Sequence, residues 1–83
     1  MVQVLENMLS KIMSKKYPGL DTFVVIYDQD FDAYSIYIIE SYGKMMERTD
    51  DEIIKIRKDI IGLLKLFNIS ENQIQVISWG DRN

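Results

Sequence analysis

The sequence predicts an α+β domain: a two-layer α/β sandwich in which both helices pack on one face of a three-stranded sheet. Two segments have the helical spacing of apolar residues, and three have the composition or alternation typical of strands. Their order along the chain is α-β-β-α-β. The length allows one small domain and not two, so residues 1–83 are expected to form a single compact α/β domain.

The first expected helix covers residues 2–16. Its apolar residues recur at spacings of three and four, which places them on one side of a helix. They are Val2, Leu5, Leu9 and Ile12. Proline disfavours helical geometry at the preceding residue and glycine permits a turn, so the Tyr-Pro-Gly sequence at 17–19 is expected to end this helix.

Two strands are expected next, at residues 21–28 and 33–41. Both are rich in β-branched and aromatic residues, and the short acidic sequence DQDFD between them predicts a hairpin. The first of these strands carries apolar side chains on both faces. That pattern is typical of a central strand, so we expect it in the middle of the sheet.

Residues 42–48 are expected to be a loop, whose two methionines either lie at an interface or cover the helices. The sequence TDDE at 49–52 then predicts a capping box that begins the second helix. Asn68 is a plausible left-handed stop for this helix. The alternation of polar and apolar residues at 72–79 predicts the third strand.

The topology follows from the connections. A strand–helix–strand crossover makes the second and third strands parallel. With the first strand in the centre, the expected spatial order is 2-1-3, and the third strand would run antiparallel to the first. This arrangement is shared by proteins with unrelated functions, so the fold alone names no activity.

Composition narrows the classes of function. The chain has no histidine and no cysteine, which excludes serine–histidine and cysteine–histidine nucleophiles and removes the commonest zinc ligand. No cofactor-binding motif is present, so we expect a non-enzymatic protein without a cofactor. The lack of cysteine favours a reducing compartment, and no apolar run approaches the ~20 residues of a membrane-spanning helix. We therefore expect a cytoplasmic location and no membrane partner.

Asp28, Asp30 and Asp32 have the spacing with which a calcium loop of the EF-hand type begins. The rest of that pattern fails, because Ala33 stands where the loop needs glycine and Ile39 where it needs glutamate. The sequence therefore predicts a hairpin turn, in which aspartates bond to their own backbone, and no metal site. A looser divalent-cation site and an acidic contact for a basic partner remain as alternatives.

The sheet face away from the helices is the expected binding surface. One alternating set is uniformly aliphatic, and we assign it to the helix-packed side, which places the other set on the open side. The aliphatic set is Val24, Ile26, Ile36, Ile38, Ile74 and Val76. That set holds most of the strand aromatics, and a bare apolar patch of this kind marks an interaction site. The candidate partner-binding residues are Phe23, Val25, Tyr27, Tyr37, Ile77 and Trp79.

Three interpretations of this face stay open. The first is a protein–protein interface, formed with a second copy or with a different protein. The second is a base-stacking platform for single-stranded nucleic acid, which the net charge of −3 and the acidic hairpin disfavour. In the third, the strand register is off by one residue, which would exchange the two faces, or a terminus folds over the sheet.

These observations predict a small acidic protein-interaction module, an adaptor, regulator or inhibitor, that binds a protein partner or forms a homodimer. A viral or mobile-element origin would suit such a chain, since acidic surfaces can block the basic grooves of nucleic-acid-handling enzymes. The alternative is a single-stranded nucleic-acid-binding module that uses the same sheet face.

Overall fold

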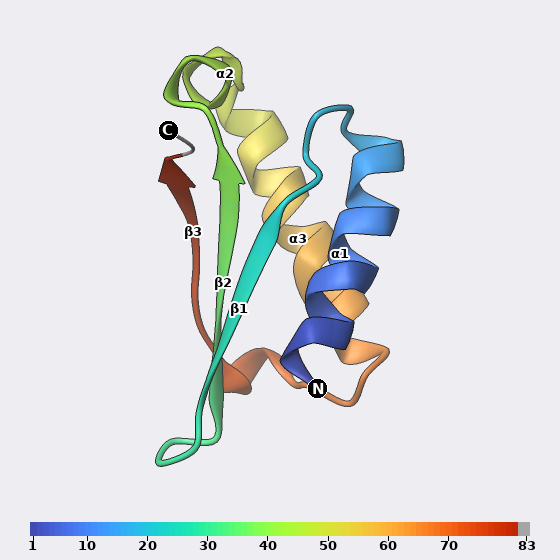
Figure 1. Ribbon diagram of the computed structural model, residues 1–83, viewed down its shortest axis with the longest axis vertical. Helices are drawn as coiled ribbons and strands as arrows, with labels where there is room; N and C mark the ends of the chain where they lie inside the picture. Colours follow the sequence, from blue (N-terminus) through green and yellow to red (C-terminus); the bar gives the residue numbers. More distant parts are fainter. Residues whose placement is uncertain (82–83) are drawn as a thin grey trace.

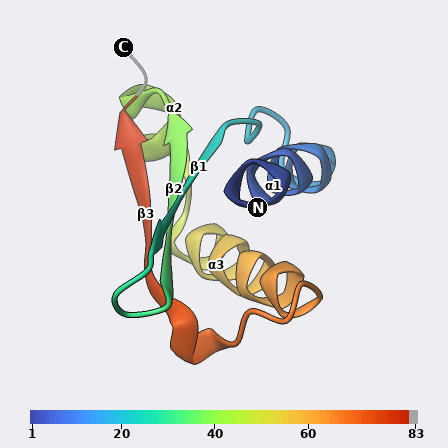
Figure 2. The ribbon, with the colours of Figure 1, turned by 60° about the horizontal axis from the view of Figure 1, so that its bottom comes forward.

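A computed structural model describes residues 1–81 of the chain. The two long helices lie together on one side of the three-stranded sheet, and the short helix lies at the end of the second strand (Figure 1, Figure 2). The α+β class, the two layers and the common side of the long helices are confirmed. The elements are α1 (Val2–Lys16), β1 (Phe23–Asp28), β2 (Ala33–Glu40), α2 (Tyr42–Glu47), α3 (Asp50–Lys65), η1 (Glu71–Gln73) and β3 (Ile74–Asp81).

The first helix has the bounds that its sequence predicts. α1 buries Leu5, Leu9 and Met13, which are four residues apart and lie on one face. The chain leaves the helix through Gly19, whose φ of 92° lies in the left-handed region that glycine adopts without steric cost. The Tyr-Pro-Gly sequence therefore ends α1 as expected.

Thr49 begins α3 as predicted. Its hydroxyl accepts a hydrogen bond from the backbone amide of Glu52 at 3.2 Å. The Glu52 carboxylate accepts from Arg48 at 3.1 Å rather than closing the second half of the capping box. After the helix, Asn68 has a φ of 61°, as expected of a left-handed stop.

Residues 42–47 form a helix, so the loop predicted over residues 42–48 is wrong. Ser41 caps this helix, and its hydroxyl accepts from the backbone amide of Lys44 at 3.4 Å. The residues that follow Gly43 favour helix formation and outweigh the single glycine. Helix α2 therefore fills the connection between the sheet and α3.

The third strand begins and ends two residues later than predicted. Residues 72 and 73 belong to η1, in which Ser70 and Gln73 close a capping box, with the Ser70 amide donating to the Gln73 side chain at 3.0 Å. β3 then extends to Asp81. Residues 72 and 73 resemble the start of an alternating strand, but they belong to the helical turn that leads the chain into β3.

The strand order is β1-β2-β3, so β2 is central and the predicted order 2-1-3 is wrong. The antiparallel hairpin of β1 and β2 and the parallel pairing of β2 with β3 are as predicted. Apolar residues on both faces of β1 suggested a central strand. The longer strand, β2, has eight residues against six and pairs on both sides instead, and β1 leaves its outward apolar residues at the surface.

The core lies between the sheet and the two long helices. Burial of one such aliphatic side chain contributes roughly 1.5–3 kcal/mol, so this single cluster holds the layers together. β3 adds partly buried residues to its margin. The core residues are Leu5, Leu9, Met13, Tyr17, Leu20, Phe23, Val25, Ile36, Ile38, Ile56, Ile60, Leu64 and Ile69.

The long helices α1 and α3 have 15 and 16 residues. Within residues 1–81, no helix combines the length and the apolar character that crossing a bilayer would require.

Candidate functional site

Two of the predicted partner-binding residues, Phe23 and Val25, are buried. They are 5% and 4% exposed and belong to the core. Phe23 lies opposite Ile38, and Val25 lies opposite Ile36. All four side chains therefore face the helices, and the predicted assignment of faces is wrong for β1.

The pairing at the hairpin shows where this error lies. Asp28 is the last residue of β1 and pairs with Ala33, which leaves a loop of only the residues 29–32. The prediction also ends the strand at Asp28, but it assigns the faces by aliphatic character, and that assignment requires a pairing shifted by one residue. Because side chains alternate along a strand, a shift of one residue exchanges the two faces of β1 relative to β2.

Ile77 and Trp79 also face the helices. Ile77 lies opposite Ile36 and Trp79 opposite Ile38, and both are partly buried against the core. The predicted open face is therefore wrong for β3 as well.

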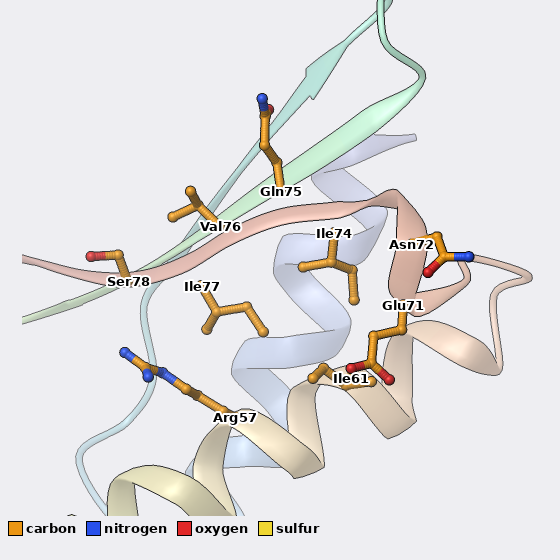
Figure 3. A pocket seen from close by; sticks show the side chains of 9 residues that line it. All are labelled: Arg57, Ile61, Glu71, Asn72, Ile74, Gln75, Val76, Ile77 and Ser78. Carbon is orange, nitrogen blue, oxygen red and sulfur yellow. The ribbon is translucent and has the colours of Figure 1, made fainter.

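A β-bulge explains the error in β3. The register with β2 shifts between two successive pairs, Tyr34–Ile74 and Ser35–Val76, so that Gln75 is an extra residue. Figure 3 shows Ile74 and Ile77 pointing toward α3, whereas Gln75 and Val76 point away from it. The bulge breaks the simple alternation that the prediction assumes.

The two predicted tyrosines lie on opposite faces. Tyr27 is on the helix side near the hairpin, 41% exposed, and its hydroxyl donates to Asp32 at 2.7 Å. This hydrogen bond raises the pKa of Tyr27. Tyr37 lies opposite Val24 and Ser78 on the other side of the sheet. Of the six predicted residues, Tyr37 alone is on the uncovered side.

The uncovered side of the sheet is made of other residues, which we call the open face. Its most exposed members, Val24, Ile26 and Val76, are 38%, 52% and 39% exposed. No helix of residues 1–81 covers this side (Figure 2). The seven residues listed next carry no charge, and one is aromatic, while Asp28 follows Ile26 on the same side of β1, at the hairpin end. The open face consists of Val24, Ile26, Ser35, Tyr37, Ile39, Val76 and Ser78.

The nucleic-acid alternative receives little support from this arrangement. Base-stacking platforms combine several aromatic rings with nearby cations. Of the candidate cations, Lys15 and Lys16 lie on α1, on the other side of the sheet, and Arg48 is bound to Glu40. The open face therefore presents a single ring without flanking positive charge from these residues.

The aspartate loop is organised by internal hydrogen bonds. Asp28 accepts from the backbone amide of Asp30 at 3.0 Å, and Asp32, with a φ of 48°, accepts from Tyr27 and from Gln73. Across residues 1–81, no three acidic side chains are grouped as a metal ion would require. The predicted hairpin turn is confirmed, and its carboxylates tie the loop to η1.

Glu40 is a buried charged residue that the sequence prediction missed. It is 2% exposed and accepts two hydrogen bonds from Arg48, at 2.7 and 2.9 Å, and one from the Trp79 indole at 3.0 Å. The hydrogen bonds with Arg48 lower the pKa of Glu40 and raise that of Arg48. A carboxylate held ionised in this way suits a structural ion pair better than proton transfer.

A second polar cluster joins the two long helices. The Tyr17 hydroxyl donates to Asp59 at 2.6 Å, and Lys16 contacts the same oxygen at 2.9 Å. Burial, together with the hydrogen bond to Asp59, raises the pKa of Tyr17 to about 12. Burial alone would raise the pKa of Asp59, but hydrogen bonds from Tyr17 and Lys16 outweigh it and lower that pKa. This carboxylate, too, is held in its ionised form.

Comparisons of the chain with protein-family models, curated proteins and solved structures found no match. The geometry of the open face, the sheet edges and the two polar clusters is therefore the basis on which a function can be proposed.

Proposed function

We propose that the chain is a small non-enzymatic protein-interaction module that pairs with a second copy of itself through the open face. One observation carries the proposal: on this side of the sheet, both edge strands hold aliphatic side chains that are between 38% and 52% exposed. Exposed apolar residues gathered on one surface are typical of interaction sites.

The distribution of charge favours a second copy of the chain as the partner that covers the open face. The chain has a net charge of −3, so two copies repel each other wherever their charged surfaces meet. In a two-fold dimer the same surface patch of each copy contacts that of the other. A charge at the centre of the patch therefore faces a like charge on the second copy. The seven residues of the open face carry no charge, and Asp28 lies beyond them at the hairpin end, so two copies can approach through the middle of the face without that repulsion.

The size of the open face sets the expected strength. Three strands about 4.8 Å apart and about six residues long give a projected area of roughly 300 Å². A stable interface buries about 800 Å² on each partner. We therefore expect a weak dimer, with a dissociation constant on the order of 100 μM.

The non-enzymatic part of the proposal rests on side-chain chemistry. The chain has no histidine or cysteine, and the carboxylates of Glu40 and Asp59 have lowered pKa values that disfavour proton donation near neutral pH. A cytoplasmic location belongs to the same proposal, because a chain without cysteine suits a reducing compartment.

Sedimentation equilibrium on the wild type, Ile26→Glu and Ile54→Glu tests the proposal. Ile26 lies on the open face and Ile54 on α3, and both are 52% exposed, so the two variants are matched. We expect the wild type and Ile54→Glu to dimerise at high concentration, and Ile26→Glu to stay monomeric with an unchanged circular dichroism spectrum. A wild type that is monomeric at millimolar concentration would contradict self-association, as would equal dimerisation of both variants.

A further inference from the structure

The two outer edges of the sheet differ in whether their backbone is occupied. On β1, the amide of Val25 donates to the carboxylate of Glu6 in α1 at 2.9 Å, so this edge is partly closed by a side chain. On β3, within the described part of the chain, residues 75–81 make no comparable bond beyond the sheet. β3 also lacks the lysine and proline residues that commonly block an edge strand. It therefore presents unpaired backbone groups.

A groove runs along this edge of β3. It has a volume of about 680 Å³ and lies between the strand and α3. Five consecutive strand residues, 74–78, line it, as expected when a groove follows a backbone edge. Ile74, Ile77 and Ile61 supply its apolar wall, and Glu71 lies at one end (Figure 3).

A second hollow continues toward α2. It has a volume of about 320 Å³, and Arg57 lines both it and the groove. Its apolar lining includes Met45, Met46, Ile53 and Trp79. Methionine side chains adapt to different shapes, which suits a pocket for a large apolar residue.

Arg57 supplies a positive charge at the junction of the two hollows. Its guanidinium carbon lies 5.8 Å from the centre of the Trp79 ring. Among the ion pairs of residues 1–81, none involves Arg57. The carboxylates of Glu71 and Asp50 also line the two hollows, but neither forms an ion pair with Arg57, so this guanidinium favours a ligand that brings a negative charge to it.

We propose that the groove between β3 and α3 binds an extended segment of a partner protein by strand addition. The segment pairs its backbone with the edge of β3 and places alternate apolar side chains against Ile61 and Ile77. An acidic residue of the segment contacts Arg57, and a larger apolar residue enters the methionine-lined hollow. The groove shares Val76 and Ser78 with the open face, so the segment does not require self-association through that face and competes with it.

A second copy of the chain fits this groove less well. Pairing of β3 with another β3 would bring a strand whose single carboxylate, Asp81, is its last residue. The middle of such a strand offers Arg57 no negative charge. A partner segment with an internal acidic residue satisfies both the backbone edge and the cation.

The test is a selection from a displayed library of random octapeptides, with the full chain as target. The targets are the wild type, Arg57→Glu and Lys55→Glu, the last being a matched charge reversal at an exposed position of α3 outside both hollows. The wild type and Lys55→Glu are expected to enrich peptides with alternating apolar residues and one acidic residue. Arg57→Glu is expected to enrich basic residues at that position instead.

Backbone pairing is tested on the best peptide recovered. Alternate backbone amides of an added strand face β3, and the remaining amides face away from it. We therefore N-methylate one set of alternate peptide residues and then the other, so that only one of the two peptides loses the donors that face β3. One set should weaken binding by about 10-fold or more, and the other set should leave it nearly unchanged. Equal effects of both sets would overturn strand addition.

Other outcomes also decide the proposal. The failure to enrich any peptide overturns it, and so does recovery of the same peptides on the wild type and Arg57→Glu. Hydrogen exchange on the complex should show protection in β3, and protection confined to β1 and β2 would overturn the assigned site. Repeating the binding with Ile26→Glu separates the two proposals, because a monomeric variant should still bind the peptide.

Discussion

β1 and β3 are both edge strands of one sheet, yet they are attached to the rest of the molecule in different ways. β1 is attached through its backbone, since the Val25 amide bonds to Glu6 on α1. β3 is attached through a side chain, since the Trp79 indole donates to the buried Glu40. A hydrogen bond to an outward-facing backbone amide partly closes the edge of a strand. A hydrogen bond through a side chain leaves the backbone groups of that edge open. The difference makes β3 the strand that can accept another strand.

The largest effect is expected from breaking the side-chain attachment of β3. Glu40→Ala removes the main partner of Arg48, whose side chain is 11% exposed, and leaves the Trp79 indole without its acceptor. Removing one partner of a buried ion pair costs about 3–5 kcal/mol of stability. Urea unfolding followed by tryptophan fluorescence measures this loss.

The matched control for this experiment is Glu52→Ala. Glu52 bonds to the same arginine, but its side chain is 39% exposed, so we expect a loss below about 1 kcal/mol. If the two variants lose the same stability, Glu40 is not the anchor of β3.

Acid should weaken the same attachment. The pKa of Glu40 is lower in the folded protein than its ordinary value, so the ionised carboxylate stabilises the fold at pH values above the unfolded pKa of about 4.3. This stabilisation is lost as the pH falls through the lowered, folded-state pKa. We expect the unfolding free energy of the wild type to fall with acid more steeply than that of Glu40→Gln. Parallel curves for the two proteins would show that other carboxylates dominate.

Alkali should weaken the support of β1 instead, because Tyr17 anchors the end of α1 to α3. Burial and the hydrogen bond to Asp59 raise the pKa of Tyr17 from 10.0 to about 12, so the neutral phenol is favoured in the folded state. Its stabilisation is complete below pH 10 and is lost as the pH rises through 12. A shift of this size corresponds to about 2–3 kcal/mol.

Unfolding in urea from about pH 9 upward measures this effect, with Tyr17→Phe as the control. The variant should be less stable near neutral pH and should lose less stability in alkali than the wild type does. An equal alkaline loss in both proteins would assign the effect to other groups.

A smaller change in stability than in these two experiments, about 1 kcal/mol, is expected for Glu6→Ala, which removes the acceptor for the Val25 amide. This variant makes the edge of β1 resemble that of β3. Amide exchange at Val25 should become faster, and the variant should associate more readily at high concentration. Glu47→Ala, which removes an exposed charge on α2, is the control for the change in net charge. Identical exchange at Val25 in Glu6→Ala and the wild type would contradict this account of the edge.

The helices and turns could be predicted because their signals are local. The hydroxyl of Thr49, the turn at Gly19 and the positive φ of Asn68 each depend on a few adjacent residues. The missed helix α2 has a local signal too, the cap at Ser41, which is followed two residues later by the helix-disfavouring Gly43.

The faces of the sheet could not be predicted in the same way. β1 is apolar on both sides, so its pattern does not choose a face, and the choice depends on the pairing at the hairpin. In β3 the extra residue Gln75 reverses the alternation. Each error is a shift of one residue. Because side chains alternate with a period of two along a strand, such a shift moves every side chain to the other face.

The candidate sites also depend on residues that are distant in sequence. The partners of Glu40 lie 8 and 39 positions away along the chain. A lone glutamate at the end of an apolar strand was the available signal, but it does not identify Arg48 or Trp79 as its partners. The groove at β3 likewise needs α3 beside the strand, which only the folded chain provides.

The parallel pairing of β2 with β3 has a consequence for the order of folding. α1, β1 and β2 are consecutive in sequence, whereas β3 joins them only after residues 41–73 have been synthesised. During that interval one edge of β2 has no strand beside it, and its residues Ile36 and Ile38 lack the cover of Ile77 and Trp79. Pairing across such a separation is slow, and an unpaired edge in a partly folded chain promotes aggregation. Docking of β3 therefore ends the period in which the growing chain is most open to pairing with the wrong strand.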